Sequence, residues 1–134
     1  MNSSIPRLML AASAAIFAFG GVMHAVAYSA KALYSINGSN LSPFLASEIK
    51  VLWLADTTTL IGLALVFGFI AAKPTTVTRI VIVMLAVIPA GTTLLLYLFL
   101  GPFYAGHMLL AACAMVVISG LLMPATNTAT KASA

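Results

Sequence analysis

Three ionisable side chains lie within apolar stretches of this sequence: His24, Asp56 and His107. Such groups are rare in apolar segments, because each costs about 2.5 to 3.5 kcal/mol if it faces lipid at the centre of a bilayer. A histidine beside an aspartate can exchange a proton near neutral pH, since each group changes the charge balance of the other. The three residues are therefore candidate catalytic acid and base groups.

Four more residues are expected to form a binding pocket with this cluster: Glu48, Trp53, Tyr97 and Tyr104. We expect the pocket to take a small lipophilic ligand or substrate that enters from the bilayer. Isomerisation, ring opening and hydration are all reactions that an acid and base pair can run. The sequence does not choose among them, and it does not establish that the protein is an enzyme.

The same residue types also allow a metal or haem site. His24, His107 and Asp56 suit zinc, iron or copper by ligand type, and two histidines can be the axial ligands of a haem. The sequence contains no His-x-x-His or Glu-x-x-His pair, and each candidate ligand lies in a different segment. The pattern is therefore unspecific, and the cofactor is left open.

A non-catalytic reading explains the same residues as a hydrogen-bonded network that fixes the register of the helices. The protein would then be a structural or accessory subunit of a membrane complex. Proton or ion passage is less favoured, because the opposite half of the apolar segments has no ionisable partner to complete a relay.

Composition limits the class of protein. The chain has 134 residues, of which 63% are hydrophobic and 6% charged, which is typical of a membrane protein. The six basic residues are scattered singly, so no nucleic-acid partner is expected. The expected partners are the lipid bilayer, a small lipophilic ligand and either a second copy of the chain or another membrane protein.

Four apolar stretches are separated by short polar segments: residues 8–30, 51–72, 80–100 and 103–123. Each has roughly 20 residues, which as a helix spans about 30 Å of hydrocarbon. Short loops favour antiparallel neighbours. The sequence therefore predicts an all-α membrane protein, a four-transmembrane-helix antiparallel bundle, as a single domain of residues 1–123 with a disordered cytoplasmic tail of residues 124–134.

The basic residues predict the orientation. Arg7, Lys73, Arg79 and Lys131 fall on one side of the bundle, and Lys31 and Lys50 on the other. The positive-inside rule then places both termini in the cytoplasm of a protein of the inner (plasma) membrane. The run Ala25-Val26-Ala27 resembles a signal-peptide cleavage site, but the first apolar stretch is longer than a signal core, so we expect it to be retained.

The polar residues are expected to lie at similar depths in the membrane. With a rise of about 1.5 Å per residue, His24, Asp56 and His107 lie roughly 6 to 9 Å inside the outer ends of their segments, and Tyr97 roughly 4 to 5 Å. We therefore expect one polar layer near the outer surface.

Three local features are also predicted. Ser42-Pro43 has the composition of a helix start. Pro89 removes a backbone donor and is expected to kink the third helix. Small residues are expected to let the first and fourth helices pack closely: Ala14, Ala18, Gly21 and Ala25 in the first, and Ala105, Gly106, Ala111 and Ala114 in the fourth.

Overall fold

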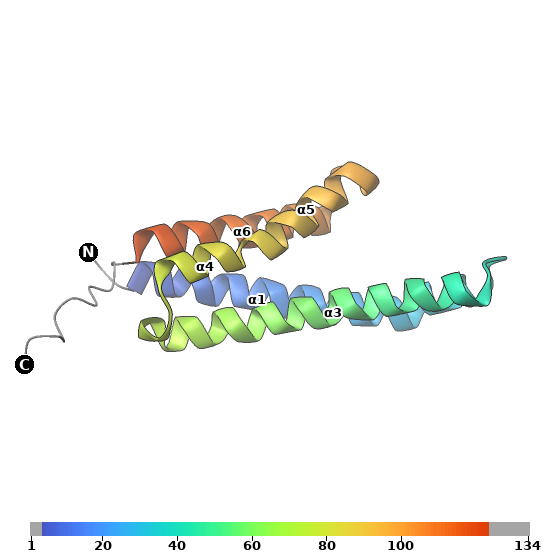
Figure 1. The fold of residues 1–134 in the computed structure, drawn as a ribbon, viewed down its shortest axis with the longest axis horizontal. Helices are drawn as coiled ribbons and strands as arrows, with labels where there is room; N and C mark the ends of the chain where they lie inside the picture. Colours follow the sequence, from blue (N-terminus) through green and yellow to red (C-terminus); the bar gives the residue numbers. More distant parts are fainter. Residues whose placement is uncertain (1–3, 124–134) are drawn as a thin grey trace, which may run out of the picture.

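A computed structural model describes residues 4–123, and every regular element in that range is helical (Figure 1). The elements are α1 (Ser4–Ala27), the π-helix η1 (Tyr28–Ala32), α2 (Leu33–Asn37), α3 (Pro43–Ala72), the 3₁₀-helix η2 (Pro74–Thr76), α4 (Arg79–Leu85), α5 (Val87–Leu100) and α6 (Tyr104–Leu122). The predicted all-α class is confirmed. The predicted tail, residues 124–134, lies outside the described residues.

The elements form four helical runs that are long and apolar enough to cross a membrane, which fits a small multi-pass membrane protein. They are Ser4–Asn37 with 34 residues, Pro43–Ala72 with 30, Arg79–Leu100 with 22 and Tyr104–Leu122 with 19. At about 1.5 Å per residue, the first run is about 51 Å long and the last about 28 Å. The first two runs are longer than the predicted spans, because each continues as a helix beyond its apolar stretch.

The start of α3 follows from the local sequence. The Ser42 hydroxyl accepts a hydrogen bond from the backbone N–H of Leu45 at 3.3 Å, and Pro43 occupies the first helical position. A serine cap satisfies one of the free N–H groups of the first turn, and proline has no N–H to satisfy there. The predicted helix start at Ser42-Pro43 is confirmed.

The third run is interrupted at Ala86, between α4 and α5. Pro89 has no N–H to donate to the carbonyl of Leu85, so the regular helical ladder is broken there. The N–H of Ala86 turns to the carbonyls of Ile82 at 3.3 Å and Val83 at 3.1 Å, which tightens the turn. The predicted kink is confirmed, and it divides the run into two helices.

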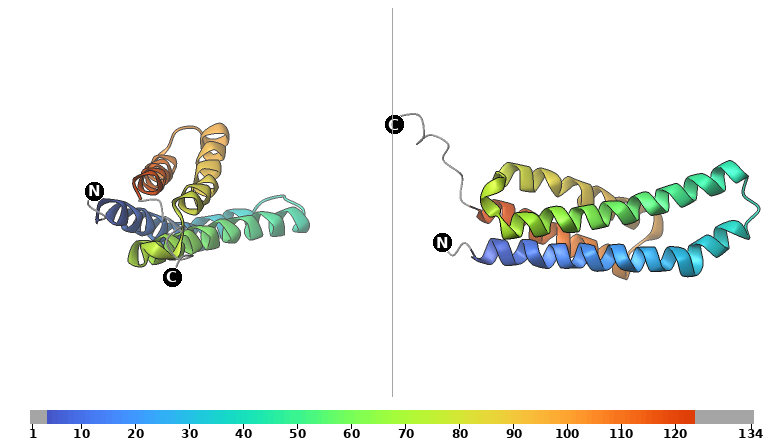
Figure 2. Two further views of the ribbon diagram at one scale, coloured as in Figure 1. Left: turned by 60° about the vertical axis from the view of Figure 1, so that its left-hand side comes forward. Right: turned by 90° about the horizontal axis from the view of Figure 1, so that it is seen from below.

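The helices pack tightly at one end of the molecule, here called the closed end (Figure 2). At this end α1 begins, at Ser4, and α6 ends, at Leu122. There α1 packs against both α3 and α6, and α4 packs against α6. The rings of Phe17 and Phe67 stack at 5.7 Å between centroids, and both side chains are fully buried. This core fixes α1 between its two neighbours.

Polar contacts also join the helices at the closed end. The hydroxyl of Ser119 donates to the carbonyl of Pro6 at 2.8 Å, and the guanidinium Nε of Arg7 donates to the carbonyl of Ala71 at 3.0 Å. Apolar surroundings make an unsatisfied carbonyl costly, so these bonds hold α1 against α6 and α3.

The close packing of the first and fourth helices is confirmed, but other residues produce it. Ala111 and Ala114 of α6, which were expected at this contact, are exposed. The contact uses Ser13, whose hydroxyl donates to the carbonyl of Ala112 at 3.1 Å. Gly21 of α1 instead faces α3, where an added Cβ would come within 2.6 Å of the Ile61 side chain.

The opposite end is open. After the break at Ala86, α5 packs on α6 and makes no extensive contact with α1 or α3 within the described chain. Figure 1 shows the α5–α6 hairpin diverging from the longer α1–α3 hairpin toward this end. A space therefore lies between the two hairpins, and the candidate site is there.

Candidate functional site

The side chains of His24 of α1 and Asp56 of α3 face each other at the open end. Their Nε2 and Oδ2 atoms are 3.4 Å apart, and the side chains are 27% and 39% exposed. The two helices pack along each other, which brings these residues together although they are 32 positions apart. The pair is therefore held by the scaffold and remains partly open to its surroundings.

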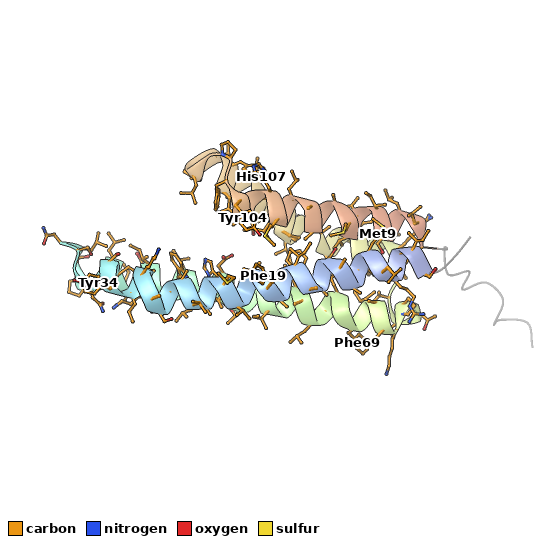
Figure 3. All side chains as sticks on the ribbon, turned by 180° about the vertical axis from the view of Figure 1, so that it is seen from behind. Met9, Phe19, Tyr34, Phe69, Tyr104 and His107 are labelled. Atoms are coloured by element: carbon orange, nitrogen blue, oxygen red, sulfur yellow. The ribbon has the colours of Figure 1, made fainter. Side chains whose placement is uncertain are left out.

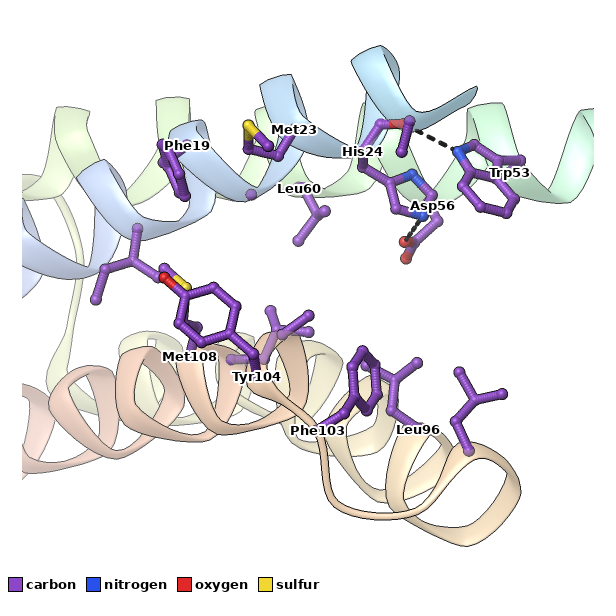
Figure 4. Close-up of a pocket in the computed structure, with 16 residues that line it drawn as sticks. Phe19, Met23, His24, Trp53, Asp56, Leu60, Leu96, Phe103, Tyr104 and Met108 are labelled. Atoms are coloured by element: carbon purple, nitrogen blue, oxygen red, sulfur yellow. Dashed lines mark hydrogen bonds and ion pairs between the residues drawn. The ribbon is translucent and has the colours of Figure 1, made fainter. Parts of the chain in front are cut away.

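Two residues of α3 hold the imidazole of His24 in place. Its Nδ1 lies 2.9 Å from the hydroxyl oxygen of Thr57, and that hydroxyl donates to the carbonyl of Trp53 at 3.0 Å. The Trp53 indole stacks on the imidazole at 4.5 Å between centroids with 21° between the planes, and its Nε1 donates to the His24 carbonyl at 3.0 Å (Figure 4). The orientation of the ring is therefore fixed at both nitrogens and on one face.

A cavity of about 510 Å³ lies beside this pair, between the two hairpins. Figure 4 shows His24 and Asp56 on one side of it and Phe103 and Tyr104 on the other. The rest of its wall is almost entirely apolar. The lining residues are Ile16, Phe19, Gly20, Met23, His24 and Ala27 of α1; Trp53, Asp56 and Leu60 of α3; Leu96 and Leu100 of α5; and Phe103, Tyr104, Ala105, Met108 and Leu109 in and before α6.

Tyr97 and His107 form a second pair, on the α5–α6 hairpin. The Tyr97 hydroxyl and the His107 Nδ1 are 2.8 Å apart, and the side chain of His107 is exposed. Neither residue lines the cavity. Figure 3 shows Tyr104 directed toward α1 and His107 directed away from it.

The structure thus divides the expected polar layer into two pairs. His24 meets Asp56, and Tyr97 meets His107, with no hydrogen bond between the pairs among residues 4–123. Of the expected pocket residues, Trp53 and Tyr104 line the cavity, whereas Glu48 is exposed and does not.

Sequence reasoning missed most of the apolar wall. Gly20 and Ala27 lie four residues before and three after His24, and Leu60 lies four after Asp56. Residues at these spacings share one face of a helix. This part of the wall could therefore have been predicted from the helix faces that carry His24 and Asp56. Phe103 and Leu96 have no such spacing from an ionisable residue of the pair.

The metal interpretation gains no third ligand from the structure. In the described part of the chain, no group of three or more His, Cys, Asp or Glu side chains is placed to hold a metal ion. His24 and Asp56 supply two ligands, and His107 lies in the other pair.

The arrangement can do two things chemically. Its apolar wall can enclose a lipophilic molecule, and the His24–Asp56 pair can donate or accept a proton at one side of that molecule.

Comparisons of the chain with protein-family models, with characterised proteins and with solved structures find no significant match.

Proposed function

We propose that this protein is an inner-membrane protein of four antiparallel transmembrane helices whose cavity binds a small lipophilic ligand or substrate. The carrying observation is the 510 Å³ cavity with one ionisable pair in an otherwise apolar wall. Sites for small molecules commonly have about 300 to 1,000 Å³ and a few polar groups that orient the ligand. The volume and the lining both support the proposal.

The residues have distinct roles in this proposal. His24 and Asp56 orient the polar group of the ligand or exchange a proton with it, and Thr57 positions the imidazole. Trp53 and Tyr104 form part of the wall. Glu48, Tyr97 and His107 have no direct contact with the ligand in this proposal.

The proposed orientation places both termini in the cytoplasm, from the distribution of basic residues. The short connections at residues 73–78 and 101–103 support antiparallel neighbours. A reporter enzyme that is active only in the periplasm, fused to the C-terminus, should be inactive. An active fusion would contradict this orientation.

Binding can be followed from inside the site, because Trp53 is the single tryptophan of the chain and lines the cavity. We expect 1-bromooctane, a neutral lipophile with a heavy-atom quencher, to quench Trp53 fluorescence saturably in protein reconstituted in nanodiscs. Ala105→Phe places a large ring in the cavity wall and should weaken the saturable quenching at least fivefold. Ala111→Phe is the matched control, because Ala111 is an exposed residue of the same helix outside the cavity.

Bromooctane dissolved in lipid can also collide with the indole, so the comparison of the two variants decides the result. Equal quenching in the wild-type protein and in Ala105→Phe would mean that the probe acts from the bilayer. The cavity would then not be a binding site, and the reading as a structural or accessory subunit would be favoured.

A further inference from the structure

The cavity has polar groups at two levels, and the second of them is the hydroxyl of Tyr104. His24 and Asp56 line the cavity at the open end. Figure 4 shows the Tyr104 ring reaching toward α1, with its hydroxyl at the level of Phe19 and Met108. Phe19 precedes His24 by five residues in α1, so this level lies nearer the closed end. The Tyr104 hydroxyl is therefore separate from the His24–Asp56 pair.

The direction of the Tyr104 side chain is unusual for a tyrosine at a membrane surface. Tyr104 is the first residue of α6, which begins at the open end. A tyrosine at the edge of a bilayer usually keeps its ring in the apolar layer and turns its hydroxyl outward to the wet head groups. The Tyr104 hydroxyl is instead directed toward the closed end, along the apolar wall of the cavity (Figure 4). Anchoring in the head groups therefore does not explain its position.

The described part of the chain offers no hydrogen-bond partner to the Tyr104 hydroxyl. Tyr97 shows the contrast, because its hydroxyl lies 2.8 Å from Nδ1 of His107. The side chains at the level of the Tyr104 hydroxyl, Phe19 and Met108, are apolar. A hydroxyl without a partner in apolar surroundings costs free energy, and a bound acceptor removes that cost. Tyr104 therefore presents a free O–H donor to a ligand in the cavity.

The rest of the wall supplies no competing polar contact. Of the residues that line the cavity, those with nitrogen or oxygen in their side chains are His24, Trp53, Asp56 and Tyr104. The Nε1 of Trp53 already donates to the carbonyl of His24 at 3.0 Å. A ligand can therefore form hydrogen bonds with side chains at two levels, the His24–Asp56 pair and the Tyr104 hydroxyl.

The distance between the two levels follows from the geometry of α1. The five residues from Phe19 to His24 correspond to about 7.5 Å along the helix axis. With C–C bonds of about 1.5 Å in a zigzag, an extended chain of about six carbon atoms covers this distance. Met23 and Leu60 lie between the two levels, so the chain would contact an apolar wall (Figure 4).

We infer that the cavity takes a neutral lipophile with two polar groups: a hydroxyl head group at His24 and Asp56, and a second oxygen about six carbon atoms away that accepts a hydrogen bond from Tyr104. This inference rests on the proposed function. A hydroxyl both donates and accepts, so it can bind the His24–Asp56 pair whichever side chain carries the hydrogen. Tyr104 is then a specificity-determining residue, because it selects the position of the second oxygen along the chain.

The test uses three isomers of decanediol as competitors of 1-bromooctane at Trp53 in nanodiscs: decane-1,2-diol, decane-1,6-diol and decane-1,10-diol. The isomers contain the same atoms and differ in the spacing of their two hydroxyls. We expect the 1,6-isomer to displace the quencher at a concentration at least threefold lower than either of the others, because its spacing matches both levels.

Tyr104→Phe keeps the ring and removes the hydroxyl, so it should reduce this preference to less than twofold. Tyr34→Phe is the matched control, because Tyr34 is 83% exposed and lies outside the cavity lining. The preference should be unchanged in that variant. Each isomer is compared between the proteins, so differences in its partition into lipid cancel.

Equal displacement by the three isomers in the wild-type protein, or a preference for one of the other two, would overturn the inference. The cavity would then remain a site for lipophiles without a second polar group. A preference for the 1,6-isomer that persists in Tyr104→Phe would also overturn it. Quenching that does not distinguish the wild-type protein from Ala105→Phe would remove the proposed function itself and the inference with it.

Discussion

The indole of Trp53 binds His24 twice, through the side chain and through the backbone. Its ring stacks on the imidazole at 4.5 Å, and its Nε1 donates to the carbonyl of the same residue at 3.0 Å. This links α1 and α3 at the point where η1, a π-helix, follows α1. π-Helical turns widen the backbone and are frequent at functional sites.

Trp53→Phe should keep part of the stacking and lose the hydrogen bond, for a loss of about 1 kcal/mol in the free energy of unfolding. Trp53→Ala should lose both, about 1 to 3 kcal/mol. The free energy of unfolding of both variants can be measured in mixed detergent micelles from the loss of helical ellipticity. Tyr34→Ala is the control, because Tyr34 is 83% exposed and its removal should change little. No loss in Trp53→Ala would show that the indole does not hold the two helices together.

Thr57→Val should remove the hydrogen bond at Nδ1 of His24, because valine has no hydroxyl group. In ¹⁵N-histidine spectra, the wild-type protein should show one tautomer of His24, and Thr57→Val should show a mixture of tautomers. Thr57→Ser keeps the hydroxyl and should restore the wild-type signal. His107→Gln assigns the two histidine signals. An unchanged His24 signal in Thr57→Val would contradict the role of Thr57 in positioning the imidazole.

Gly106→Ala should destabilise the α5–α6 hairpin by about 1 to 3 kcal/mol, because its Cβ overfills a packed contact. That atom would come within 2.7 Å of the Tyr97 ring. Gly91→Ala is the matched control: no atom lies within 4 Å of an added Cβ there, so the change should be neutral or stabilising by up to about 1 kcal/mol. The free energies of unfolding of the two variants can be compared in detergent. Equal effects would mean that Tyr97 does not pack against Gly106 as described.

Ser119→Ala should lower the free energy of unfolding by about 0.5 to 1.5 kcal/mol, because the hydrogen bond that joins α6 to the carbonyl of Pro6 in α1 is lost. Ser47→Ala is the comparison, since the Ser47 hydroxyl makes an exposed bond to the carbonyl of Pro43 within its own helix. The same unfolding assay measures both. A smaller loss for Ser119→Ala than for Ser47→Ala would contradict the role of Ser119 in joining α1 to α6.

The sequence predicted features that depend on position along a helix. The start at Ser42-Pro43 and the break near Pro89 follow from local backbone chemistry. The contact of His24 with Asp56 also follows from depth, because both lie at similar distances from a shared loop on neighbouring helices.

The side of each helix that faces the cavity could not be predicted in the same way, because it depends on how the helix is rotated about its axis. Tyr97 and His107 form a hydrogen-bonded pair of their own and lie outside the cavity. In a soluble helix the contrast of polar and apolar residues marks the buried face, but lipid and protein interior are both apolar, so these segments show little such contrast. The shape of the cavity and most of its apolar lining could not be predicted either, because they depend on the direction that α5 takes after Ala86.

The unequal lengths of the helical runs have a consequence for the bilayer. The 19 residues of α6 match a hydrocarbon layer of about 30 Å, whereas the run Ser4–Asn37 exceeds it by about 20 Å. His24 lies 20 residues after Ser4, about 30 Å along the helix, so in a bilayer matched to α6 it stands at the boundary between acyl chains and head groups. An amphiphile arriving sideways from that leaflet already has its polar group at this level. In the proposed function, such a ligand exchanges between lipid and protein without carrying its polar group through the hydrocarbon.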